Sequence, residues 1–135
     1  MLSHVCVGVG DFARAFNFYG ELAEELGWRL KFADAAASRA AWMGRTGDQP
    51  LFVIRQPFDT APAGAGNSTM IALDADSRDM VRLAYAVAIA GGGACEGVPG
   101  LRPHYHPHCY AAYFRDPDGN KLCVVCHHEV REAEL

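Results

Sequence analysis

The sequence predicts an α+β protein in which two tandem βαβββ modules form curved sheets around a cavity, with one helix packed outside each module. Three observations lead to this fold class. A strand pattern followed by a capped helix occurs twice, at a constant offset of 66 residues. Proline and glycine are concentrated in residues 57–66, which predicts a linker. Two late apolar runs flank residues 116–120 (DPDGN), which predicts a tight antiparallel hairpin.

Composition limits the class of protein. With 135 residues, half of them hydrophobic and 21% charged, the chain fits one globular domain, with modules at about 1–57 and 67–128. A net charge of -4 without a Lys or Arg run argues against nucleic acid as a partner. No apolar run approaches the roughly 18 residues of a membrane helix, so we expect a cytoplasmic protein without a membrane partner. Five cysteines, an odd number, indicate reduced thiols.

The first module begins with a strand predicted at residues 2–9. Its alternating residues give a core face of Val5, Val7 and Val9 and a cavity face of His4, Cys6 and Gly8. Asp11 caps the following helix and Gly27 ends it. The apolar stripe of this helix consists of Phe12, Phe16, Tyr19, Ala23 and Leu26. Three strands are predicted next, at residues 28–33, 39–43 and 51–55.

The second module repeats this order. Residues 69–75 predict a strand, Ser77 caps a helix, and the glycines at 91–93 stop it. A later strand begins at 95–98, and residues 97–109 predict a long irregular loop, of a length that is often functional. At the offset of 66, Met70 occupies the place of His4, so both are expected to point inward. The predicted pocket is lined by His4, Cys6, Met70, Ala72, Cys123 and Val125.

Histidines alternate in the long loop, at positions 104, 106 and 108. Three imidazoles could bind a metal, but Pro103 and Pro107 interrupt the backbone, so we interpret the loop as a rigid pocket rim. An anionic or aromatic ligand is expected at the cavity mouth. The predicted ligand-binding side chains are Cys6, Trp42, Phe52, Arg102, His104 and Tyr105.

The last strand contains Cys123 and Cys126 followed by His127, which matches the haem-attachment string CxxCH. Residues three apart in an extended strand point to opposite faces, so the two thiols cannot reach one haem edge together. We therefore predict no haem. The same geometry argues against a CxxC zinc half-site.

Four segments carry a resemblance to a known family: His4-Val5, residues 11–19 (DFARAFNFY), Gly66-Asn67 and residues 101–120 (LRPHYHPHCYAAYFRDPDGN). On these segments the chain resembles the vicinal oxygen chelate superfamily, which includes glyoxalases, extradiol dioxygenases and bleomycin-resistance proteins, and in particular its small bacterial glyoxalase-like branch. The resemblance also implies a symmetric homodimer.

In metal-using relatives, a His on the first strand of each module and a Glu on the last strand hold a divalent ion. The resemblance places these positions at His4, Met70 and Cys123, of which only His4 matches. We therefore expect no cofactor, with a Zn, Ni, Fe or Mn ion as the alternative. A soft site for Cu(I) or Zn on the same three side chains is a further alternative.

Two functions follow from these expectations. The first is a pocket that binds a small organic molecule without transforming it. The alternative is a metal-dependent glyoxalase-type lyase or isomerase, similar to lactoylglutathione lyase and acting on a thiol-conjugated aldehyde, or a dioxygenase-like enzyme. Because two of three metal positions lack the expected ligand, we favour binding.

Overall fold

The protein is described by a computed structural model that places residues 1–130. The first half contains β1 (His4–Gly8), α1 (Phe12–Leu26), β2 (Arg29–Asp34), β3 (Arg39–Met43) and β4 (Leu51–Arg55). The second half contains β5 (Ile71–Asp74), α2 (Arg78–Ala90), β6 (Ala94–Leu101), β7 (Tyr110–Arg115) and β8 (Lys121–Cys126). Two helices and two four-stranded sheets in this order confirm the predicted α+β class of tandem βαβββ modules. None of the helices in this part of the chain is both long and apolar enough to cross a bilayer.

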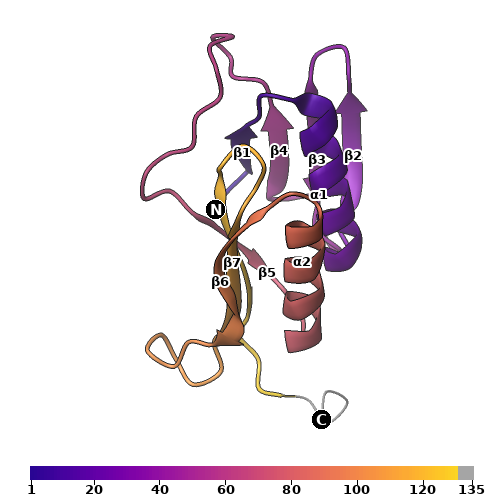
Figure 1. The fold of residues 1–135 in the computed structure, drawn as a ribbon. Helices are drawn as coiled ribbons and strands as arrows, with labels where there is room; N and C mark the ends of the chain where they lie inside the picture. Colours follow the sequence, from indigo (N-terminus) through magenta and orange to yellow (C-terminus); the bar gives the residue numbers. More distant parts are fainter. Residues whose placement is uncertain (131–135) are drawn as a thin grey trace.

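The two sheets have the same topology. Their strand orders are β1-β4-β3-β2 and β5-β8-β7-β6. In each sheet the first strand of the half runs parallel to the last, and the other neighbours are antiparallel. The helices lie side by side against one another, α1 over β3 and β4, and α2 over β6, β7 and β8 (Figure 1). The chain between β4 and β5 arcs away from the sheets (Figure 1).

Helix α1 begins and ends at the predicted residues. The Asp11 carboxylate accepts a hydrogen bond from the Arg14 amide at 3.0 Å, and Gly27 adopts the left-handed conformation, φ 71°, that favours glycine. Its buried face differs in part from the predicted stripe: Phe12 and Phe16 are only half-buried, and they stack on each other. The buried residues are Ala15, Phe18, Tyr19, Leu22, Ala23 and Leu26.

Strand β6 continues further than predicted, because residues 97–101 belong to it rather than to the loop. Pro99 is tolerated because β6 lies at the edge of its sheet, where a missing backbone donor costs no ladder bond. The pairing with β7 shifts register around Gly97 and Gly100, so these glycines mark irregularities within the strand.

Strand β8 has two buried faces. Leu122, Val124 and Cys126 join the main core between helices and sheets. Cys123 and Val125 belong to a smaller cluster on the other face of the sheet, away from the helices. The members of this smaller cluster are Cys109, Ala111, Cys123 and Val125, with Tyr113 packed against them. Cys123 and Cys126 thus lie on opposite faces of the strand, as predicted from their spacing.

The turn between β7 and β8 joins the two halves of the molecule. Its Asp116, only 3% exposed, is the one charged residue among residues 1–130 that is buried as a whole. Four polar contacts link this turn to the first half: Tyr19 Oη to Asp116 Oδ2 at 2.6 Å, Asn120 Nδ2 to the Gly8 carbonyl at 2.9 Å, the Gly10 amide to Asp118 Oδ1 at 2.8 Å, and Arg14 to Asp118 at 3.2 Å. This turn therefore sets how the two sheets lie relative to each other.

Candidate functional site

A cavity of about 460 Å³ lies between the two halves. Its first wall comes from β1, from the ends of β3 and β4, and from the loop at residues 44–50, and its second wall comes from β5. This volume lies within the range of small-molecule sites. The lining residues are Leu2, Val5, Leu26, Trp28, Trp42, Met43, Gly44, Arg45, Thr46, Gln49, Pro50, Leu51, Phe52, Ile71, Ala72, Leu73, Asp74 and Asp76.

Three aromatic rings give this cavity an apolar wall. Trp42 on β3 pairs across the sheet with Phe52 on β4, so both rings project from the same face. The Trp28 ring lies 5.3 Å from that of Phe52, centroid to centroid. Behind them Tyr19 of α1 packs on Phe52 at 5.0 Å, which holds the wall against the helix. An aromatic wall of this kind suits an apolar or aromatic ligand.

The lining also contains charged side chains. Arg45 forms an ion pair with Asp76, and this contact bridges the two halves. Gly27 makes room for the arginine, because a Cβ at this glycine would lie 2.6 Å from Arg45 Cγ. Asp74 is exposed and pairs with no cation in the described part of the chain. The site therefore combines an aromatic wall with an unpaired carboxylate.

The structure brings only part of the predicted pocket to this cavity. Trp42, Phe52 and Ala72 line it. The other predicted residues lie elsewhere. His4 and Cys6 are exposed on β1, Met70 is exposed just before β5, Cys123 and Val125 are in the smaller cluster, and Arg102, His104 and Tyr105 are in the loop after β6.

Most of the lining residues were not predicted from the sequence, among them Trp28, Arg45, Asp74 and Asp76. Trp28 directly follows Gly27, where helix α1 ends, and this position is the one sequence signal that could have placed Trp28 near the cavity. Arg45 and Asp76 lie in connections between elements, 31 residues apart. No sequence pattern indicates that these two would meet.

The family's metal position does not fit a divalent ion in this chain. The His4 ring is exposed, and its Nδ1 is hydrogen-bonded to the Ser3 hydroxyl at 3.1 Å. Met70 offers a thioether, a soft ligand that hard ions do not select. At Cys123 a thiol, whose pKa burial raises to about 11, stands where the family has a carboxylate, and sulfur is likewise a soft ligand that hard ions do not select.

One group of potential ligands gathers elsewhere. The group consists of His106, Cys109 and His127, whose ligand atoms all lie within 4.8 Å of one another. In residues 1–130 no other three His, Cys, Asp or Glu side chains meet this criterion. His4 is not part of the group.

Comparison with known proteins agrees with this architecture. Residues 1–124 match the family model described as Glyoxalase/Bleomycin resistance protein/Dioxygenase superfamily. The chain belongs to this superfamily. Among solved structures, the glyoxalase/bleomycin resistance protein from Albidiferax ferrireducens T118 is 36% identical, with a TM-score of 0.83 over 93% of this chain and 98% of that one. No curated protein sequence matches significantly.

Two more distant superfamily structures show the fold alone. The glyoxalase-related enzyme from Fulvimarina pelagi is 18% identical, with a TM-score of 0.71 over 93% of this chain and 87% of that chain. The lactoylglutathione lyase from Agrobacterium tumefaciens is also 18% identical, with a TM-score of 0.62 over 93% and 92%. Membership in the glyoxalase superfamily is thus established, and the chemistry of this member has to be argued from its own side chains.

Proposed function

We propose that this superfamily member binds a small organic molecule in the cavity between its two halves and does not use the family's metal chemistry. The observation that supports this most strongly is the aromatic wall formed by Trp28, Trp42 and Phe52 in a cavity of about 460 Å³. The poor fit of Met70 and Cys123 to a hard ion supports the second half of the proposal. A binding protein needs the cavity, whereas a metal-dependent lyase or dioxygenase would need ligands that these two positions lack.

The lining indicates the class of ligand. Flat apolar rings pack favourably against tryptophan and phenylalanine. Asp74 is the unpaired charge of the lining, since Asp76 already interacts with Arg45. We therefore expect a ligand with an aromatic body and a cationic or hydrogen-bond-donating group that meets the Asp74 carboxylate.

Intrinsic fluorescence tests this directly. The chain has two tryptophans, Trp28 and Trp42, and both line the cavity, so the whole tryptophan emission reports on its occupancy. The probes are phenethylamine and 3-phenylpropionate, which share a phenyl ring and carry opposite charges. Fragments of about nine to eleven non-hydrogen atoms reach roughly millimolar affinity when each atom contributes about 0.4 kcal/mol. We expect phenethylamine to change the emission with saturation, and phenylpropionate to bind several-fold more weakly.

Variants distinguish the contribution of the aromatic wall to binding from that of the Asp74 charge. Ala72→Phe fills the cavity and should abolish the response, while Ala86→Phe on the exposed part of α2 is the matched control and should leave it unchanged. Asp74→Asn should remove the preference for the amine, and Glu24→Gln on the exposed face of α1 should keep it. No saturable response to either probe, or an unchanged response in Ala72→Phe, would contradict the proposal.

Three earlier expectations stay predictions: the cytoplasmic location, the module boundaries and the symmetric homodimer. For the dimer, the structure offers one supporting feature. Leu30 and Phe32 are large apolar side chains that are 50% and 38% exposed on β2. The bulge between them puts the two side chains on opposite faces of the sheet, since their partners Trp42 and Ala41 are adjacent in β3. Because β2 is an edge strand, pairing of two copies along it would satisfy its free backbone groups and cover part of both side chains.

A further inference from the structure

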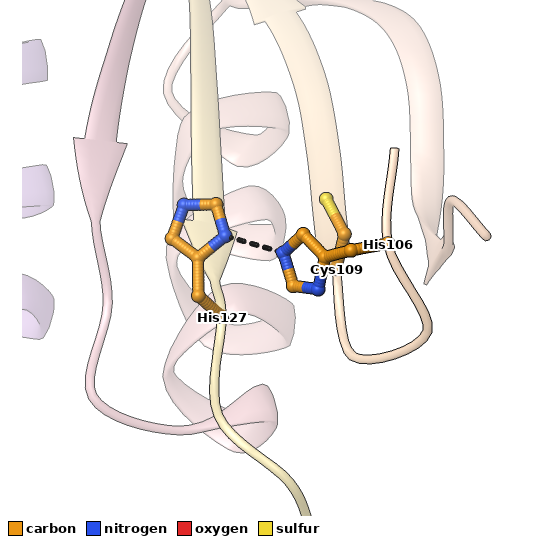
Figure 2. A group of neighbouring side chains, drawn as sticks. All are labelled: His106, Cys109 and His127. Atoms are coloured by element: carbon orange, nitrogen blue, oxygen red, sulfur yellow. Dashed lines mark hydrogen bonds between the residues drawn. The ribbon is translucent and has the colours of Figure 1, made fainter. Parts of the chain in front are cut away.

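His106, Cys109 and His127 come together on the face of the second sheet that points away from the helices (Figure 2). None of the three lines the cavity between the halves. The two imidazole rings face each other, and Cys109 lies beside His106 (Figure 2). Their ligand atoms lie within 4.8 Å of one another. This cluster is therefore separate from the proposed binding cavity.

Strand register explains why two of the three residues meet. Tyr110 pairs with Cys126 at the end of the β7–β8 ladder, so one step further Cys109 stands opposite His127. Successive side chains alternate between faces, which places both residues on the same face as Cys123 rather than Cys126. Two of the three potential ligands are therefore held at the ends of paired strands.

The third residue reaches the cluster through a short turn. The Cys109 amide donates to the His106 carbonyl at 3.2 Å, which folds the end of the loop back on itself. The Arg102 amide donates to the Cys109 carbonyl at 2.7 Å, which closes the base of the same loop. The neighbouring His108 ring interacts with the Glu129 carboxylate instead, at 3.3 Å. Of the three histidines that alternate in the loop, the structure thus brings one into the cluster.

In the absence of an ion, the two rings are joined by a hydrogen bond of 2.8 Å between His106 Nε2 and His127 Nδ1. His106 Nδ1 accepts a hydrogen bond from the His108 amide at 3.2 Å. The proton of the neutral His106 ring therefore lies on Nε2 and is donated to His127. His106 Nε2 and His127 Nδ1 therefore already point at one position between the rings, which the shared proton occupies.

We propose that this cluster is a zinc site, with His106 Nε2, His127 Nδ1 and the Cys109 thiolate as ligands. Imidazole and thiolate are ligands that zinc prefers, and hard ions such as Mg²⁺ or Ca²⁺ require oxygen. Zinc–nitrogen bonds of about 2.0–2.1 Å in a tetrahedral site put two ligand nitrogens roughly 3.3 Å apart. The rings thus have to separate by about 0.5 Å, a movement that the exposed side chain of His127 permits.

Binding also moves two protons. The Cys109 thiol releases its proton to solvent as the zinc–sulfur bond forms. The His106 proton shifts from Nε2 to Nδ1, so the ring stays neutral and gives up its hydrogen bond with the His108 amide. Three protein ligands leave a fourth position for water or a small ligand, the arrangement of zinc sites with an open coordination position. This site would tie the loop after β6 to the end of β8.

Cobalt(II) is the probe for the test, because it occupies zinc sites and reports its ligands optically. The full chain without an affinity tag is stripped with chelator and titrated with Co²⁺, followed by displacement with Zn²⁺. We expect a thiolate-to-cobalt charge-transfer band and visible bands of tetrahedral intensity, saturating at one ion per chain and lost on adding Zn²⁺. The absence of a charge-transfer band would overturn the proposal.

Variants assign the ligands. His127→Gln changes an exposed side chain and should weaken Co²⁺ and Zn²⁺ binding by at least about tenfold. Even the loss of a group that only supports a metal ligand commonly lowers metal affinity by about that factor. His128→Gln, the exposed neighbour, is the matched control and should bind like the parent. His106→Gln should weaken binding like His127→Gln, and Cys109→Ser should abolish the charge-transfer band. An unchanged affinity in His127→Gln overturns the proposal even where Cys109→Ser fails to fold.

Thiol controls complete the assignment. Cys6→Ser removes an exposed thiol on the first sheet and should leave the charge-transfer band in place. A band that disappears in Cys6→Ser and persists in Cys109→Ser would place the ion elsewhere and contradict the proposed site.

Discussion

Replacing Asp116 by Asn keeps the size of this buried side chain and removes its charge. Asp116 Oδ1 accepts hydrogen bonds from the amides of Asp118 and Asn120, both at 2.9 Å. Oδ2 accepts from Tyr19 Oη at 2.6 Å and from Asn120 Nδ2 at 2.9 Å. An amide at this position can keep the two backbone bonds through its carbonyl oxygen. Its NH₂ group then faces Asn120 Nδ2, also a donor, so one bond is lost and the others weaken.

The magnitude follows from these four bonds. A hydrogen bond to an ionised group contributes about 1.5–3 kcal/mol and a neutral one about 0.5–1.5 kcal/mol. One lost bond and three weakened bonds, offset by the easier burial of a neutral group, give a loss of about 2–4 kcal/mol in the free energy of unfolding for Asp116→Asn. Tyr19→Phe removes one of the same bonds and should cost about 1.5–3 kcal/mol. Because the two side chains interact directly, the double variant should cost about 1–2 kcal/mol less than the sum.

Urea unfolding, followed by circular dichroism and by tryptophan emission, measures these values. Tyr105→Phe is the matched control, since this ring is 66% exposed, and it should stay within about 0.5 kcal/mol of the parent. A loss below about 1 kcal/mol for Asp116→Asn, or strict additivity with Tyr19→Phe, would refute the view that this carboxylate joins the two halves.

Two further predictions concern stability. Burial and the nearby Asp116 carboxylate raise the pKa of Tyr19 well above its usual value. The stability that the neutral tyrosine contributes is therefore complete below about pH 10, and above it the free energy of unfolding falls by up to about 1.4 kcal/mol per pH unit. Urea titrations of the parent and of Tyr19→Phe across this pH range measure the difference. Gly27→Ala should lower the free energy of unfolding by about 1–2 kcal/mol in thermal unfolding, because it strains a left-handed residue and displaces Arg45. Gly20→Ala places no atom within 4 Å of the added Cβ, so it should raise the free energy of unfolding by about 0.5–1 kcal/mol.

The sequence was sufficient for the fold because the local signals agree with each other. Asp11 and Ser77 cap the two helices as predicted, and the three-residue spacing of Cys123 and Cys126 correctly placed them on opposite faces of β8. Such signals depend on neighbouring residues along the chain. Where the local signal was ambiguous, as for Pro99 in an edge strand, the prediction of a loop was wrong.

The candidate sites depend on contacts between distant residues, which periodicity does not encode. The ion pair of Arg45 with Asp76 forms across the junction of the two halves. His106 meets His127 because the loop after β6 folds back toward the end of β8, and the sequence grouped it instead with its neighbours in the loop. The burial of Asp116 was missed for the same reason, although its turn was predicted from residues 116–120.

Turnover of a glutathione hemithioacetal by the metal-loaded protein tests the central claim most directly. The parent, His4→Gln and His127→Gln are each stripped and reloaded with Zn, Ni, Fe or Mn before the assay. Because the family's metal position lacks two suitable ligands, we predict no turnover above the uncatalysed rate in any of them. Turnover by the parent that is lost in His4→Gln and kept in His127→Gln would contradict this account.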